Sequence, residues 1–174
     1  MRTAEYRLRM EFVVVVVQWL HVLLGILWFG NALTLDVIVI PAINRLPIVA
    51  QREISSYIGS RATPIFHVVV PLIIVLGFIR GTFLGPIKSV DVLLGSAYGL
   101  TWLTALGVTI VTYLFGLFVI VPALRRMDRA PLNPDGSATA ELASATDRVK
   151  RLVGLELLGF LVIFTCMILM RFGL

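Results

Sequence analysis

The sequence predicts an all-α integral membrane protein built as a four-helix bundle. Of its 174 residues, 59% are hydrophobic and only 14% are charged, and the mean hydropathy is +0.97. Several uncharged runs reach the roughly 20 apolar residues that a helix needs to cross a bilayer. The length suits four such spans with short loops, so we expect a single transmembrane domain over residues 1–174.

The formal net charge of +5 does not indicate a nucleic-acid-binding protein. In a soluble chain such an excess would suggest a nucleic-acid partner. Here the basic residues gather at the ends of the apolar runs, where they face anionic lipid head groups and set topology. We therefore expect the lipid bilayer as partner and no nucleic acid. The single cysteine, Cys166, excludes an intrachain disulfide.

The first predicted span covers residues 12–36 and opens with the β-branched run FVVVVV. This run weakly disfavours a helix, but length and hydrophobicity decide the conformation in lipid. The apolar stretch exceeds the 7–15 residues typical of a signal-peptide core, and no A-x-A cleavage site interrupts it. We therefore expect a span that stays in the protein.

The other three predicted spans are separated by segments that carry charge or turn residues. They cover residues 62–84, 100–121 and 152–170. We expect a polar loop 1 over 43–61 and a hydrophilic loop 3 over 125–151, whose P-L-N-P-D-G core is typical of turns. No internal repeat is convincing enough to divide the chain.

Lysine and arginine residues are unevenly distributed between the two sides. The side with both termini carries Arg2, Arg7, Arg9, Arg80, Lys88 and Arg171. The other side carries Arg45, Arg52, Arg61, Arg125, Arg126, Arg129, Arg148, Lys150 and Arg151. The positive-inside rule then predicts a multi-pass protein of the cell membrane with loops 1 and 3 in the cytoplasm and both termini outside.

Both histidines of the chain, His21 and His67, lie inside predicted spans. An ionisable side chain in a span is costly and is a functional candidate by default. His21 is ten residues from Glu11, or about 15 Å, and His67 is thirteen residues from Arg80, or about 20 Å. Because the first two helices run in opposite directions, we expect the two imidazole rings to face each other at a similar depth.

Two imidazoles on facing helices are a known way to hold a haem in a bundle. Gly25 leaves space one helical turn from His21, and Trp28 lies on the same helix face. Arg80 is the expected partner of the haem propionates because it shares a helix with His67. Further candidates are Lys88 and Arg171 as cationic partners and Phe66, Phe78 and Trp102 as aromatic walls.

The leading prediction is therefore a b-type cytochrome-like protein with haem b as cofactor, active in electron transfer with a redox partner protein or quinone. Two alternatives remain open. One is a copper-handling protein, with soft ligands suited to copper(I); its candidate ligands are His21, His67, Cys166 and Met170. The other is a non-catalytic subunit whose polar groups only hold helices together. A second copy of the chain is a further candidate partner under any of these hypotheses. No pattern typical of hydrolysis or group transfer is present.

Two further expectations concern packing. Gly77, Gly81 and Gly85 form overlapping G-x-x-x-G units, which we expect to pack within the bundle rather than at a dimer interface. The carboxylates Asp36 and Glu156 lie near the loop 1 and loop 3 side. We expect them to pair with nearby arginines, namely Arg61, Arg125 or Arg151.

The pattern W-L-H-x6-W-F-G, from Trp19 to Gly30, resembles the first helix of CopD-type copper-resistance domains and related four-helix membrane proteins. More distantly it is similar to HemJ-type protoporphyrinogen oxidases. In these families a histidine precedes a tryptophan by seven residues, as His21 precedes Trp28. The first resemblance implies copper handling. The second implies haem b binding, with His21 at the position of the family's first-helix histidine.

Overall fold

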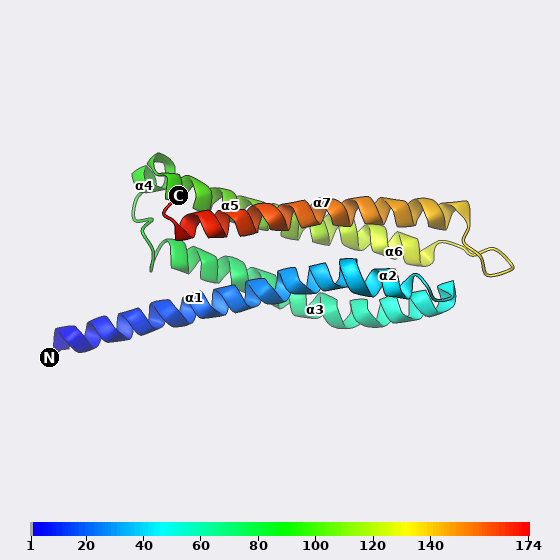
Figure 1. Cartoon of the computed structure of the whole chain (residues 1–174), viewed down its shortest axis with the longest axis horizontal. Coiled ribbons are helices and arrows are strands. Elements are labelled where there is room, and N and C mark those ends of the chain that lie inside the picture. The colour runs from blue at the N-terminus through cyan, green and yellow to red at the C-terminus, as the bar shows by residue number, and fades with distance from the viewer. Residues whose placement is uncertain (1) are drawn as a thin grey trace.

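A computed structural model describes residues 2–174 of the protein, and within this range it contains helices and no strand. Four long helical rods run side by side (Figure 1). Their segments, in chain order, are α1 (Arg2–Thr34), the π-helical turn η1 (Leu35–Val39), α2 (Ile40–Ile43), α3 (Ile48–Gly81), the short α4 (Val90–Gly95), α5 (Ala97–Phe115), the π-helical turn η2 (Gly116–Ile120), α6 (Val121–Arg129) and α7 (Ala140–Arg171).

Each rod is long and apolar enough to cross a membrane. The four candidate spans among the described residues are Leu8–Ile43, Ile48–Gly81, Ala97–Arg129 and Ala140–Arg171. Many large apolar side chains point away from the protein; Phe118, for example, is 73% exposed. Such exposure suits contact with lipid, in which every backbone polar group must be paired inside the helix. The protein is an all-α, four-helix, multi-pass membrane protein, as the sequence predicts.

The rods form two antiparallel hairpins. In Figure 1 the rod of α1 and α2 lies along α3, and the rod of α5 and α6 lies along α7. Between the hairpins, α3 packs on α5, and aromatic rings connect α1 to α7. The N-terminal part of α1 extends beyond the rest of the bundle at the end where the C-terminus and α4 lie (Figure 1).

The helices continue well into the polar segments that the sequence suggests as loops. The helix α3 begins at Ile48, so that only residues 44–47 of the predicted loop 1 connect two helices. Within the predicted loop 3, only residues 130–139 lie outside α6 and α7. The start of α7 is capped by Thr139, whose hydroxyl accepts a hydrogen bond from the Leu142 N–H at 3.2 Å. Polar residues therefore mark where the chain leaves the lipid and not where the helix ends.

The two π-helical turns occupy equivalent places in the two hairpins. Residues 35–42 read LDVIVIPA and residues 116–123 read GLFVIVPA, with a π-helical turn just before each proline. A proline in a regular α-helix lacks an N–H and clashes with the carbonyl four residues earlier, and widened turns are common at such places. The number of residues that separates Pro41 from Pro122 is the same as the number that separates His21 from Trp102. The first rod of each hairpin therefore has the same local feature, a π-helical turn before a proline.

The glycine face of α3 lies close to one ring from α1 and one ring from α5. A Cβ at Gly81 would lie 2.0 Å from Trp102 Nε1, and one at Gly77 would lie 2.9 Å from His21 Cε1. Glycines at these positions let the two rings lie against α3. The expectation that this G-x-x-x-G face packs within the bundle is confirmed for Gly77 and Gly81.

We predict that Gly81→Ala destabilises the protein, because the added methyl group displaces the Trp102 indole. Overpacking of this kind costs about 1–3 kcal/mol. Reversible unfolding in mixed detergent micelles measures the change, and tryptophan fluorescence reports the displacement. Gly107→Ala is the matched control, since a Cβ at Gly107 meets nothing within 4 Å. Equal stability of the two variants would contradict this account of the packing.

Candidate functional site

A cavity of about 820 Å³ lies between the two hairpins. All four rods contribute to its lining, which includes His21, Trp28, Ile73, Trp102, Phe160 and Met167. Its volume falls within the roughly 300–1,000 Å³ of typical small-molecule and cofactor sites. Like such sites, it is lined mostly by apolar and aromatic side chains with a few polar groups. The cavity is therefore the candidate ligand site of this protein.

His21 is the half-buried imidazole in the cavity lining, and its orientation is fixed by the backbone of α3. Its Nδ1 lies 3.1 Å from the Ile73 carbonyl oxygen. A carbonyl only accepts hydrogen bonds, so Nδ1 carries the proton and donates it. In the neutral ring this leaves Nε2 with a free lone pair. Gly77 makes the approach of the ring to α3 possible, as described above.

One end of the cavity is positively charged. Arg80, at the end of α3, donates from Nε to Gln18 Oε1 at 2.9 Å and from Nη1 to the Leu84 carbonyl oxygen at 3.4 Å. Arg171, at the end of α7, also lines the cavity. Among the side chains that the structure describes, the salt bridges Arg9–Glu5 and Lys150–Asp147 involve neither cavity arginine, so neither arginine has a described carboxylate partner. This end therefore suits an anionic group.

Four of the predicted site residues come together. His21, Gly25, Trp28 and Arg80 all line the cavity. Trp28 packs edge-on against Phe160, with ring centroids 4.7 Å apart, and so joins the first helix to the last. A Cβ at Gly25 would meet nothing within 4 Å, which agrees with open space beside His21.

His67 is not part of this group. It lies exposed on α3, outside the cavity lining, with Nδ1 2.7 Å from the Thr63 carbonyl oxygen of its own helix. The expected face-to-face arrangement with His21 is wrong because the depth comparison assumed that Arg80 is level with Glu11. Arg80 instead bonds Gln18, seven residues further along α1, and this shift amounts to about 10 Å.

Several other candidates also lie apart from the cavity. The Lys88 ammonium donates to the carbonyl oxygens of Thr82 and Phe83, at 2.8 and 2.7 Å, beyond the end of α3. Phe66 and Cys166 do not line the cavity, whereas Met170 does. Phe78 packs on Trp102, with ring centroids 5.9 Å apart. The four residues considered for copper therefore do not form one cluster.

The two carboxylates in the spans do not pair with arginines as expected. None of the described salt bridges involves Asp36 or Glu156. Glu156 instead lies beside the start of η2, where a Cβ at Gly116 would be 3.2 Å from its Oε1. The helices α3 and α7 begin inside the predicted loops 1 and 3. The polar residues of these segments therefore lie on the helices, further from the carboxylates than short loops would place them.

Met167 is a cavity residue that the sequence does not single out. A methionine in an apolar helix usually fills space, and only the packing of α7 shows that Met167, Met170 and Arg171 share the face toward the cavity. The spacing of these three residues from Phe160 and Phe164 is the signal that a helical-wheel comparison would have found.

The fold and the cavity define a polytopic four-helix membrane protein with a ligand-sized site between two hairpins. Comparison of the chain with protein-family models, curated proteins and solved structures gives no match. The site is therefore interpreted from its own residues.

Proposed function

We propose that this protein binds one haem b in the cavity between the hairpins and transfers electrons within the membrane. The observation that carries the proposal is His21, an imidazole fixed through Nδ1 by a backbone carbonyl, with Nε2 free and the ring beside a large apolar cavity. Histidines that bind metals typically have this arrangement, in which the second nitrogen donates to a carbonyl or carboxylate.

The rest of the cavity agrees with the shape and charge of haem. Its lining is mostly apolar, with Trp28, Trp102 and Phe160 as aromatic walls. Arg80 and Arg171 at one end suit the two propionates, because a guanidinium binds a carboxylate in a planar, bidentate geometry. The donor set and the cavity thus fit a haem, whose propionates Arg80 and Arg171 would hold.

Each of these residues has a distinct part in this function. A bound haem supplies an iron centre that accepts and releases one electron. His21 would hold the haem iron through Nε2, and the Ile73 carbonyl fixes the imidazole ring and would increase its basicity. The apolar walls exclude water, and the arginines balance the propionate charge. The electron partner is a membrane quinone or a redox protein that reaches this part of the bundle.

A copper-handling role is the second candidate. Met167 and Met170 line the same cavity as His21, and thioether and imidazole ligands suit copper(I). The large volume and the two arginines favour haem, since a single cation needs neither. Elemental analysis of the purified protein distinguishes the two, because stoichiometric copper without iron would replace the haem proposal with this one.

The haem proposal predicts a b-type signal in the dithionite-reduced minus oxidised spectrum of protein purified from haem-replete cells. We expect His21→Ala to abolish the signal, because the axial nitrogen is lost. His67→Ala should leave it unchanged, since His67 does not line the cavity. Absence of haem from the unsubstituted protein would overturn the proposal, as would an unchanged spectrum in the His21 variant.

Arg80→Gln is predicted to lower the haem midpoint potential, because a positive charge near the propionates favours the reduced form. The effect should be on the order of 1 kcal/mol at a partly solvated site. Redox titration measures it. Lys88→Gln is the control, since that ammonium lies at the same end of the protein but bonds backbone carbonyls outside the cavity. Equal potentials in the two variants would exclude Arg80 as a propionate partner.

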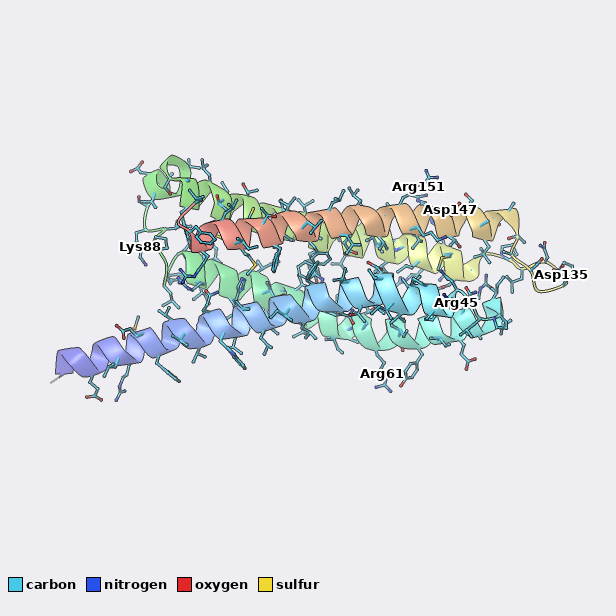
Figure 2. All side chains as sticks on the ribbon, viewed as in Figure 1. Arg45, Arg61, Lys88, Asp135, Asp147 and Arg151 are labelled. Atoms are coloured by element: carbon cyan, nitrogen blue, oxygen red, sulfur yellow. The ribbon has the colours of Figure 1, made fainter. Side chains whose placement is uncertain are left out.

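We further propose that both termini and the cavity arginines lie toward the outside of the cell membrane, with residues 44–47 and 130–139 in the cytoplasm. The supporting observation is the excess of basic residues on the loop 1 and loop 3 side. Lys88 and Asp135 mark opposite ends of the molecule in Figure 2, so a label at each position tests the orientation.

In intact cells, an impermeant maleimide should label Lys88→Cys but reach Asp135→Cys only after the membrane is opened. The native Cys166 is buried, and the unsubstituted chain measures its background. The reverse labelling pattern would invert the topology without affecting the haem proposal.

A further inference from the structure

The packing of α1 against α7 fixes which residues of α7 lie level with His21. The two helices run in opposite directions (Figure 1), and Trp28 contacts Phe160 with ring centroids 4.7 Å apart. His21 lies seven residues before Trp28, and Met167 lies seven residues after Phe160. Since both helices rise by 1.5 Å per residue, Met167 is close to the level of His21.

A second aromatic contact between α1 and α7 gives another estimate of which residues of α7 lie level with His21. Phe29 stacks on Phe164 with ring centroids 6.0 Å apart. His21 is eight residues before Phe29, and residue 172 is eight after Phe164. The two contacts therefore place residues 167–172 opposite His21, a range that includes both Met167 and Met170.

Both methionines also lie on the helix face that the cavity requires. Phe160, Phe164, Met167 and Arg171 follow one another at spacings of four, three and four residues, which is one face of a helix, and all four line the cavity. Met170 lines it as well and, like Met167, is half-buried. Cys166, the residue before Met167, is buried and does not line the cavity.

The remaining cavity residues offer few other ligands to iron at this level. His67 lies outside the cavity. Tyr98 lines it, but lies one turn before Trp102 on α5, toward the end with Arg80 and Arg171. Trp102 itself donates its Nε1–H to the Gly77 carbonyl oxygen at 3.4 Å and has no lone pair for a metal.

We infer that a thioether of α7, from Met167 or Met170, is the second axial ligand of the haem, opposite His21. This inference rests on the proposed haem function and replaces the pair of histidines by a histidine–methionine pair. The methionine sulfur is a neutral ligand that needs no deprotonation in the apolar cavity. Histidine–methionine ligation raises the reduction potential of haem, so this protein would accept electrons more readily than one with two histidine ligands.

The test uses the full-length, haem-loaded protein and three variants, Met167→Leu, Met170→Leu and the double substitution. Leucine keeps the side-chain volume nearly constant. The readouts are the weak far-red charge-transfer band of a thioether bound to ferric haem and the midpoint potential. We expect the double variant and one of the single variants to lose the band and to have a lower potential. His67→Ala is the control and should change neither, since His67 lies outside the cavity.

The outcomes separate this inference from the proposed function. A protein that binds haem through His21 but lacks the band, or a double variant that keeps both band and potential, overturns the inference alone. A protein without haem overturns both. If the double variant loses haem, histidine at position 167 or 170 (Met167→His, Met170→His) should restore it with a spectrum of two imidazole ligands. Failure of both histidine variants to do so would overturn the inference.

Discussion

The close approach of two aromatic rings to the glycine face of α3 is the constraint on which the rest of the structure depends. His21 comes from one hairpin and Trp102 from the other, and each directs a ring nitrogen at a backbone carbonyl of α3. In a hydrocarbon environment a polar N–H without a partner is costly, so these bonds fix both rings. Side chains at Gly77 and Gly81 would block them. The Trp102 contact therefore joins the two hairpins, and the His21 contact, within the first hairpin, fixes the imidazole beside the cavity.

The sequence was sufficient to predict the class of the fold because bilayer thickness translates directly into the length of apolar runs. It was not sufficient to predict helix ends, since helices continue through polar segments outside the lipid. The pairing of His21 with His67 was wrong for a related reason. The prediction compared the depths of His21 and His67 by taking Glu11 and Arg80 as level. However, α1 extends past the bundle, and Arg80 is level with Gln18. The register between two helices depends on how they pack against each other, and the sequence of one helix alone does not determine this.

The cavity itself follows from how two similar hairpins are joined. Each has a π-helical turn followed by a proline, and the offset that relates these turns places His21 and Trp102 at equivalent positions. Both residues line the cavity. Aromatic contacts such as Trp28 with Phe160 bring the hairpins together on one side, while α3 and α5 meet on the other. Sequence patterns along one helix identify half of such a site, and the facing residues of α7 emerge only from the assembled bundle.

The length of the rods has a consequence for the depth at which the cavity lies in a membrane. At 1.5 Å per residue, the 32 residues of α7 measure about 48 Å, against roughly 30 Å for the hydrocarbon core of a bilayer. The helix α7 therefore extends beyond the hydrocarbon core, and the cavity lies toward the end of α7 that is opposite the turn at 130–139. A cofactor there is remote from that turn and within reach of a lipid-soluble carrier diffusing in the nearer leaflet. If the cavity binds haem as proposed, electrons would enter and leave this protein on one side of the membrane.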